Sequence, residues 1–228
     1  VFTRLALGSF SAFSIGFLRY FFASAVLAIA VWAAKMKRPA RKDLIWFATA
    51  GALGFFLYMI TFNQGLITVT ASTGSVVIAT VPVMTALFAL LIYKEDLRLH
   101  QWIAILIEFI GVTVLTLMNS VFSVNIGLSW LFGAAVALSL YNLIQRKLTK
   151  TYTALQASTY SIFFGTLMLT IFLPGTLGEI PDAQGLHVFY VAVMGVLSSA
   201  AAYAAWAKAF SKAKKTSQVS NYMFVTPF

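Results

Sequence analysis

The chain has 228 residues, of which 61% are hydrophobic and 10% charged, and its formal net charge is +10 at pH 7. A soluble domain contains about 25% charged residues, so this composition excludes a soluble protein and predicts helices that cross a membrane. In a membrane protein the excess of Lys and Arg indicates how the loops are oriented. We therefore expect a lipid bilayer and no nucleic acid among its partners.

The predicted elements follow from runs of about 20 apolar residues, the length that crosses the hydrocarbon of a bilayer. A helix remnant ends near Leu7, and a last helix begins near Thr216. Because the chain begins without Met and inside a helix, we expect both ends to be truncated. Complete spans are predicted at 13–34, 44–67, 73–93, 101–118, 127–145, 154–173 and 186–207. The sequence thus predicts an all-α polytopic membrane protein with about nine helices represented.

The loops between these spans alternate in charge. One side contains 14 basic residues, whereas the other contains only Arg4 and Arg19, together with the acidic Glu179 and Asp182. Short basic loops remain in the cytoplasm, which predicts the orientation, and we expect the bacterial cytoplasmic (inner) membrane. The basic residues are Lys35, Lys37, Arg38, Arg41, Lys42, Lys94, Arg98, Arg146, Lys147, Lys150, Lys208, Lys212, Lys214 and Lys215.

A helix–loop–helix unit occurs twice. Ser72 and Ser217 are 145 residues apart, as are Pro82 and Pro227. The loop before the first serine has no charge, whereas the loop before the second contains three lysines, so we expect the two copies to be inverted in the membrane. The prediction is two five-helix repeats, residues 1–118 (first helix truncated) and 119–228 (last helices truncated), with ten helices when complete.

Three stretches resemble the EamA family of the drug/metabolite transporter superfamily, which includes YddG-like amino-acid exporters. FLRYFFASAVL contains Arg19 of the second-helix motif, and the stretch from ITFNQGLITV to AILIEFIGV contains Pro82, Glu95 and Gly111. AYAAWAKAFSKAKKTSQVSNYMFVTPF resembles the matching part of the second repeat. The chain departs from the family at Ala104, where glycine is frequent, and at Glu108, where an apolar residue is usual.

Polar side chains concentrate on the predicted third, fourth, sixth, eighth and ninth helices, which line the central cavity in the resembled family. They either line such a cavity or form interhelical hydrogen bonds, which contribute about 0.6 kcal/mol each on average. The resemblance implies a substrate cavity. The candidates are Asn63, Gln64, Thr73, Ser75, Tyr141, Asn142, Tyr203, Trp206, Gln218 and Asn221.

Pro82 and Pro227 lie at equivalent points of the fourth and ninth helices. Proline has no N–H, so it removes a helical hydrogen bond and bends the helix. Such breaks are tolerated in a membrane where protein or a water-filled cavity satisfies the backbone. Matched placement in the two copies favours gating kinks over incidental ones.

Glu108 is predicted at the middle of a span, on one helical face with Ala104, Gly111 and Val112. An acid there costs about 2.5–3.5 kcal/mol, so we expect it to face a packed neighbour rather than lipid. Two roles remain open: a proton relay, or a protonated side chain that holds helices together. For Arg19 we expect a structural anchor rather than an anion ligand.

The sequence predicts a secondary transporter that exports or exchanges small organic metabolites such as amino acids by alternating access; export is implied by the resemblance alone. It contains no Cys, no ATP-binding loop and no His pair with metal-ligand spacing, so we expect no cofactor, metal or enzymatic activity. Alternatives are a proton-coupled multidrug exporter that uses Glu108, an intramembrane enzyme, or a receptor without transport. Oligomeric state is left open.

Overall fold

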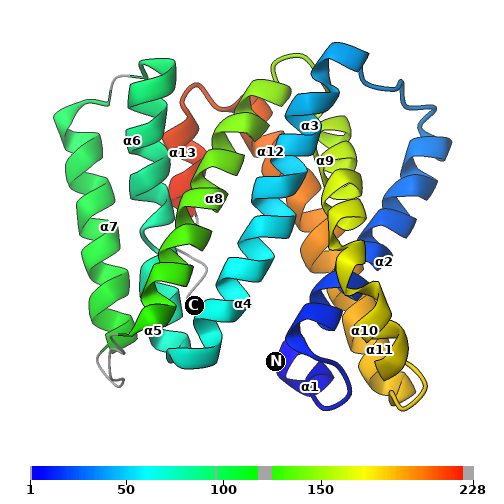
Figure 1. Cartoon of the computed structure of the whole chain (residues 1–228). Helices are drawn as coiled ribbons and strands as arrows, with labels where there is room; N and C mark the ends of the chain where they lie inside the picture. Colours follow the sequence, from blue (N-terminus) through cyan, green and yellow to red (C-terminus); the bar gives the residue numbers. More distant parts are fainter. Residues whose placement is uncertain (1, 96, 118–124, 223–228) are drawn as a thin grey trace. The chain divides into compact units, whose positions relative to one another are not determined.

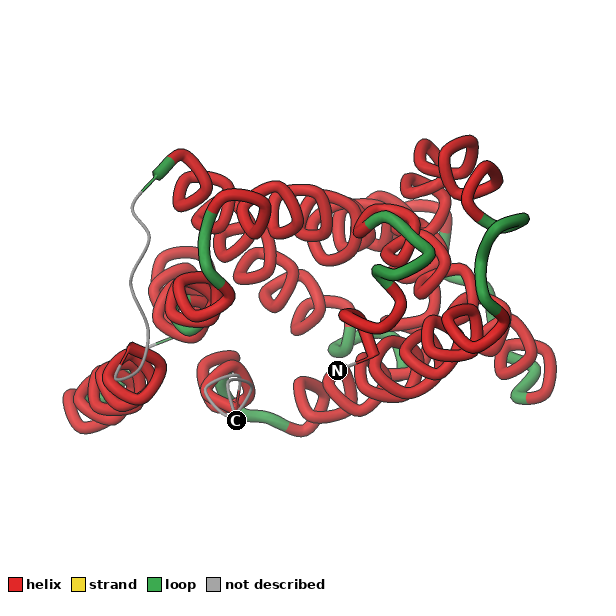
Figure 2. Tube along the Cα trace, turned by 90° about the horizontal axis from the view of Figure 1, so that it is seen from below, coloured by secondary structure: helices red, strands yellow, loops and turns green. Residues whose placement is uncertain are grey.

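The computed structural model describes residues 2–95, 97–117 and 125–222, and within these ranges it contains helices and loops but no strand (Figure 2). The predicted all-α class is confirmed. The α-helices are α1 (Phe2–Ala6), α2 (Ala12–Ala33), α3 (Leu44–Gly51), α4 (Tyr58–Thr68), α5 (Ala71–Ile78), α6 (Val81–Tyr93), α7 (Leu99–Leu117), α8 (Ile126–Leu148), α9 (Ala154–Leu169), α10 (Leu173–Glu179), α11 (Gly185–Val193), α12 (Ala202–Lys212) and α13 (Thr216–Ser220). Short 3-10 segments, η1 (Arg41–Asp43) and η3 (Thr170–Phe172), and π-helical segments, η2 (Ala52–Leu57) and η4 (Met194–Ala201), connect some of them.

Six helical stretches, several of them made of consecutive elements, are long and apolar enough to cross a membrane, among the residues described. They agree with the predicted spans within a few residues at most ends, although the 154–173 span continues through α10 to Glu179. The stretches are Ala12–Ala33, Arg41–Thr68, Ser72–Tyr93, Ile126–Leu148, Ala154–Glu179 and Gly185–Lys212, and a shorter apolar stretch covers Leu99–Gly111. The predicted last helix is observed as α13, which begins at Thr216.

Helix starts are fixed by side-chain caps. Ser11 and Thr70 accept backbone N–H groups at the first turns of α2 and α5, and Thr153 forms a reciprocal capping box with Gln156 at the start of α9. Lys35, just after α2, and Lys94, just after α6, have positive φ values of 45° and 53°. A left-handed residue at this point stops a helix by turning the chain away from its axis.

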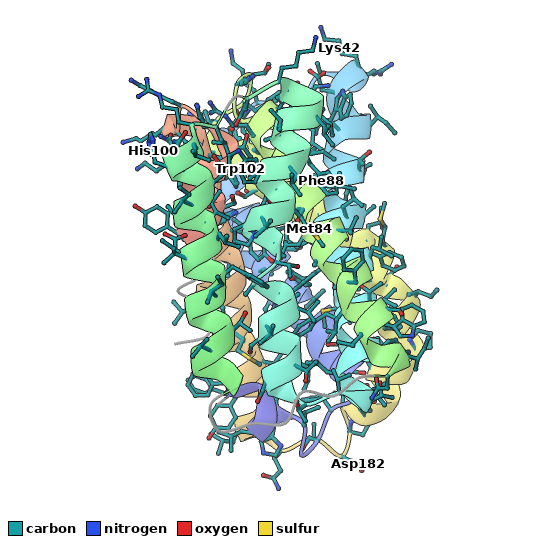
Figure 3. The ribbon with its side chains drawn as sticks, turned by 90° about the vertical axis from the view of Figure 1, so that its left-hand side faces the viewer. Lys42, Met84, Phe88, His100, Trp102 and Asp182 are labelled. Atoms are coloured by element: carbon teal, nitrogen blue, oxygen red, sulfur yellow. The ribbon has the colours of Figure 1, made fainter. Side chains whose placement is uncertain are left out.

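The chain divides into two compact units. Unit 1 comprises Val1–Phe56 and Lys147–Ser211, and unit 2 comprises Leu57–Arg146 and Lys212–Phe228. In unit 1, α2 packs against α9, α3 packs against α9, and η4 packs against α2 (Figure 1). Lys42 and Asp182 lie at opposite ends of this unit (Figure 3), so its basic and acidic loops are separated by the length of the helices.

In unit 2, α6 contacts both α13 and α7, and α5 contacts α4 and α7. A buried apolar cluster of Ala79, Ala86 and Ile105 joins α5, α6 and α7, with Trp102 and Phe109 packed beside it. Gly65 of α4 lies against Leu131 of α8: a Cβ on this glycine would lie 2.6 Å from the Leu131 Cγ atom and 3.1 Å from the Gly127 carbonyl oxygen. This close approach requires glycine and brings α4 against α8.

Candidate functional site

The two π-helical segments occupy matching positions in the sequence. Shifting η2 by the 145-residue step gives 197–202, which overlaps Met194–Ala201 of η4. Each segment interrupts a long apolar helix, with α-helix on both sides. π-Helical turns account for well under 1% of residues and occur mostly at functional sites. Because such turns are rare, their occurrence at matching positions of both long helices indicates a functional role for the irregular backbone there.

A glycine at each π-helical segment permits close contact with a neighbouring helix. A Cβ on Gly51 would lie 2.7 Å from the Ser161 carbonyl oxygen, and one on Gly195 would lie 2.6 Å from the Arg19 carbonyl oxygen. The clashing atoms are backbone, so neither contact is relieved by a rotamer change. The two partner helices, α9 and α2, are themselves related by the 145-residue step. The two long helices are therefore held against their neighbours in the same way.

An aromatic cluster surrounds η2 within unit 1. The Phe55 ring, buried in η2, meets the Tyr20 ring at 5.2 Å and the Tyr203 ring at 4.9 Å, both edge to face. The Ser158 hydroxyl of α9 donates to the Tyr203 carbonyl oxygen at 2.9 Å. Tyr203, a predicted cavity residue, thus belongs to a cluster whose other members, Tyr20 and Phe55, were not predicted.

Three hydroxyl groups of unit 1 are buried without a hydrogen-bond partner among the described residues. They belong to Thr159 and Ser161 of α9 and Ser199 of η4, all 0% exposed. A buried hydroxyl without a partner costs about 1–3 kcal/mol, so these groups are candidates for contact with water or a polar ligand. These three residues were not predicted, although the polar run Ser158–Thr159–Tyr160–Ser161 inside an apolar span is a usable signal.

The predicted residues of α8 are fully buried in unit 2. Tyr141 and Asn142 are both 0% exposed, and the Asn142 amide donates to the Thr85 hydroxyl of α6 at 3.3 Å. The Ser139 hydroxyl donates to the carbonyl oxygen of Val81 at 3.2 Å. Asn142 therefore has the interhelical hydrogen bond that was the alternative to cavity lining, and Thr85 and Ser139 are polar contacts that were not predicted.

The remaining candidates differ in burial. Thr73 is buried at the start of α5, where its hydroxyl lies 2.9 Å from that of Thr70. Trp206 of α12, in unit 1, packs edge to face on Phe210 at 5.6 Å. Asn63, Gln64, Ser75, Trp206 and Asn221 are half-buried. The buried Oδ1 atom of Asn221 has no hydrogen-bond partner among the described residues.

Gln218 has a structural role. Its side chain is exposed, and its Oε1 atom accepts the backbone N–H groups of Lys214 and Lys215, each at 3.2 Å. These bonds close the loop before α13. The contacts of Gln218 are therefore those of a cap, and none of them supports its predicted place in a cavity.

The predicted break at Pro82 is present. α5 ends at Ile78, α6 begins at Val81, and Pro82 occupies the first turn of α6, where its missing N–H needs no helical partner. Its side chain is buried. The matching Pro227 lies outside the described residues.

Glu108 differs from its predicted environment. Glu108, Ala104 and Gly111 are all exposed, and a Cβ on Gly111 would meet no atom within 4 Å. The expectation that this face of α7 contacts a packed neighbour is therefore wrong for the described structure, because the α5 and α6 contacts of α7 are made through Ile105, Trp102 and Phe109 instead. Arg19 is half-buried and donates to the hydroxyl of its neighbour Tyr20, on the same helix, at 2.9 Å; its role as an anchor stays a prediction.

The EamA-like transporter family matches residues 1–117 and 125–228. Over 225 residues the chain is 27% identical to the uncharacterized transporter YdfC of Bacillus subtilis, covering 98% of this chain and 73% of that protein. It is 26% identical over 224 residues to a probable terminal-alkyne amino-acid exporter of Streptantibioticus cattleyicolor, covering 98% and 75%.

A third relative, the S-adenosylmethionine uptake transporter of Rickettsia prowazekii, is 26% identical over 151 residues, which cover 66% of this chain and 50% of that protein. A solved crystal structure shares the fold, with a TM-score of 0.77 and 18% identity, over 99% of this chain and 78% of the other. With its apolar helices and this family match, the chain belongs to the EamA-like transporter family, whose members are integral membrane transporters and not enzymes.

Proposed function

We propose that the protein exports or exchanges small organic metabolites, with amino acids as the first class to test. The family match and the similarity to an amino-acid exporter support this class. The similarity to an uptake transporter makes the direction of net flux an experimental question.

The proposed architecture is two inverted five-helix repeats, residues 1–118 and 119–228. Its structural support is the matched packing in unit 1: the α3 helix lies on α9, and η4 lies on α2, while the 145-residue step relates α2 to α9 and η2 to η4. The helix pair in one copy therefore has a corresponding pair in the other copy. This correspondence is expected if both copies adopt the same fold. The basic loops are proposed to face the cytoplasm.

The proposed mechanism is alternating access, with η2 and η4 as the points where the two long helices bend. A π-helical turn shifts the hydrogen-bond pattern by one residue, so backbone carbonyls there lose regular partners and the helix bends at low cost. Pro82 supplies a comparable break between α5 and α6. The matched π-helical segments, each held by a glycine contact, are the observation that carries this mechanism.

A flux measurement tests the function. The purified protein is reconstituted into liposomes that contain a panel of labelled amino acids and related metabolites. Efflux is then followed with and without a pH gradient. Protein-dependent efflux or counter-exchange of a panel member supports the proposal. Hydrolysis of a panel member, or tight binding without flux, contradicts it. Efflux of lipophilic cations that requires the pH gradient favours the proton-coupled multidrug exporter instead.

Cysteine labelling tests the inverted arrangement. The chain contains no cysteine, so single cysteines at Lys37, Thr149 and Lys214 are expected to be shielded from an impermeant thiol reagent in intact cells. Cysteines at Thr70 and Gln184 are expected to react. Labelling of the Lys214 position from outside contradicts the inverted arrangement, because that loop distinguishes inverted from parallel copies.

A further inference from the structure

The loop between α2 and α3 in unit 1 concentrates positive charge. It contains Lys35, Lys37, Arg38, Arg41 and Lys42, and all five side chains are exposed. None of these five side chains forms a hydrogen bond or ion pair with another residue that the structure describes. Figure 3 shows Lys42 at this end of unit 1. The cations are therefore available to a partner of opposite charge.

The backbone of this loop is fixed by bonds to other parts of unit 1. The Gln156 amide donates to the Lys37 carbonyl oxygen at 3.0 Å, and the Tyr152 hydroxyl accepts the Ala40 N–H at 3.2 Å. The same Tyr152 hydroxyl donates to Asp43, the acid that follows the five cations. Because the backbone is held and the acid is already engaged, the cationic side chains are presented outward without an internal counterion.

A hollow lies directly beside these charges at the end of α2. It has a volume of about 460 Å³ and is lined by Val31, Trp32, Ala33, Lys35 and Met36. Trp32 is 82% exposed, and the exposed side chains of Ile29 and Val26 continue from it along one face of α2 at helical spacing. One lysine thus lies at the junction between a cationic loop and an apolar stripe.

We propose that this hollow and loop bind an anionic phospholipid. The phosphate is held by Lys35, Lys37 and Arg38, and an acyl chain lies along Trp32, Ile29 and Val26. Tryptophan at the end of a spanning helix is typical of the headgroup level of a bilayer, and clusters of Lys and Arg there attract anionic lipids. The apolar stripe favours a lipid over a free phosphate, which has no acyl chain to cover it.

The test uses the complete protein in neutral detergent micelles titrated with phosphatidylglycerol or phosphatidylcholine, with thermal unfolding as the readout. Phosphatidylglycerol is expected to raise the unfolding midpoint, and phosphatidylcholine is expected to have little effect. In a Lys35→Gln/Lys37→Gln/Arg38→Gln variant the lipid concentration for half of the shift should increase about fivefold for each charge removed. A Lys208→Gln/Lys212→Gln/Lys214→Gln variant, which removes three exposed charges elsewhere, should respond like the parent protein.

Equal responses in the two triple variants overturn the site, because the effect is then one of net charge. A Trp32→Ser variant keeps every charge and replaces the first triple variant if that variant does not fold. Its lipid-dependent shift of the unfolding midpoint should be largely lost. A full shift in this variant overturns the proposal. Glycerol phosphate, which has the anion without acyl chains, should not raise the midpoint. A rise as large as that from phosphatidylglycerol assigns the site to soluble anions and overturns the lipid assignment.

Discussion

The Glu95 carboxylate, in the loop after α6, caps the first residue of α13. It accepts the Thr216 backbone N–H at 2.7 Å and the Thr216 hydroxyl at 2.8 Å. The Arg146 guanidinium donates to the Lys214 carbonyl oxygen at 3.2 Å beside it. A glutamate identified in the sequence only by family resemblance thus has a physical role: it fixes the beginning of one helix of unit 2 at the end of another.

Glu95→Gln is expected to lower the stability of the protein by about 2 kcal/mol, because hydrogen bonds to a charged acceptor contribute about 1.5–3 kcal/mol. The measurement is the thermal unfolding midpoint in detergent. Asp182→Asn removes an exposed acid elsewhere and is the matched control. If both variants unfold at the same temperature as the parent, the Glu95–Thr216 contact does not stabilise α13.

Gly51→Ala and Gly195→Ala are each expected to destabilise the protein by about 1–3 kcal/mol, since the added methyl group must separate two packed helices. Gly178→Ala is the control, because a Cβ there meets no atom within 4 Å. Thermal unfolding and metabolite flux are measured together. If the π-helical segments serve as bending points, the Gly51→Ala and Gly195→Ala variants lose flux at temperatures where they remain folded. Unchanged flux in these folded variants contradicts that role.

The hydrogen bond to Asp43 raises the pKa of the Tyr152 hydroxyl above its usual value of 10.0, with a smaller contribution from burial. A raised pKa means that the folded state favours the protonated phenol. The stabilisation is therefore complete below about pH 10 and is lost as the pH rises through the folded-state pKa. The difference in unfolding midpoint between the parent and Tyr152→Phe should shrink above that pH.

The helices were predictable from the sequence because a membrane-spanning segment is recognised by its length and apolar composition alone. The starts of α2 and α9 agree with the prediction because Ser11 and Thr153 are strong N-caps. The π-helical segments were not predictable, since nothing in the composition of 52–57 distinguishes a π turn from an α turn. Their matched positions become visible only once the backbone is known.

The candidate site was only partly predictable, because polarity identifies a residue but not its partner. Asn142 and Gln218 are both polar residues near helix ends in the sequence, yet one bonds across helices and the other caps a loop. Phe55 was missed because an aromatic residue in an apolar span carries no signal of its own. Glu108 was placed on a packed face because helical periodicity groups residues but does not say which group faces protein.

Pro82→Ala is expected to leave folding largely intact and to slow transport. Pro82 is buried in the first turn of α6, where its missing N–H costs no helical bond. Alanine permits α5 and α6 to join into one regular helix, which removes the break. Initial efflux rates at matched protein amounts provide the measurement, with an exposed proline, Pro174→Ala, as the control. Equal rates in the two variants make the break incidental.

The exposed position of Glu108 in the structure changes the result expected from its substitution. As a helix-joining acid, it requires a partner, and Glu108→Leu would then be damaging. In the described structure the side chain is exposed on an apolar helix, where a carboxyl group costs about 2.5–3.5 kcal/mol in lipid. We therefore expect Glu108→Leu to fold at least as well as the parent, and Glu108→Gln to be nearly silent in flux and in unfolding.

Two results contradict this expectation for different reasons. Loss of pH-driven flux in a folded Glu108→Gln variant, with substrate binding retained, identifies Glu108 as a proton relay, since glutamine keeps the shape of the protonated acid but cannot release a proton. Lower thermal stability of Glu108→Leu, with normal behaviour of Glu108→Gln, shows instead that the side chain donates a hydrogen bond to a neighbour in the membrane. Measuring both variants in the same liposomes, with and without a pH gradient, separates the relay, the helix contact and the silent exposed acid.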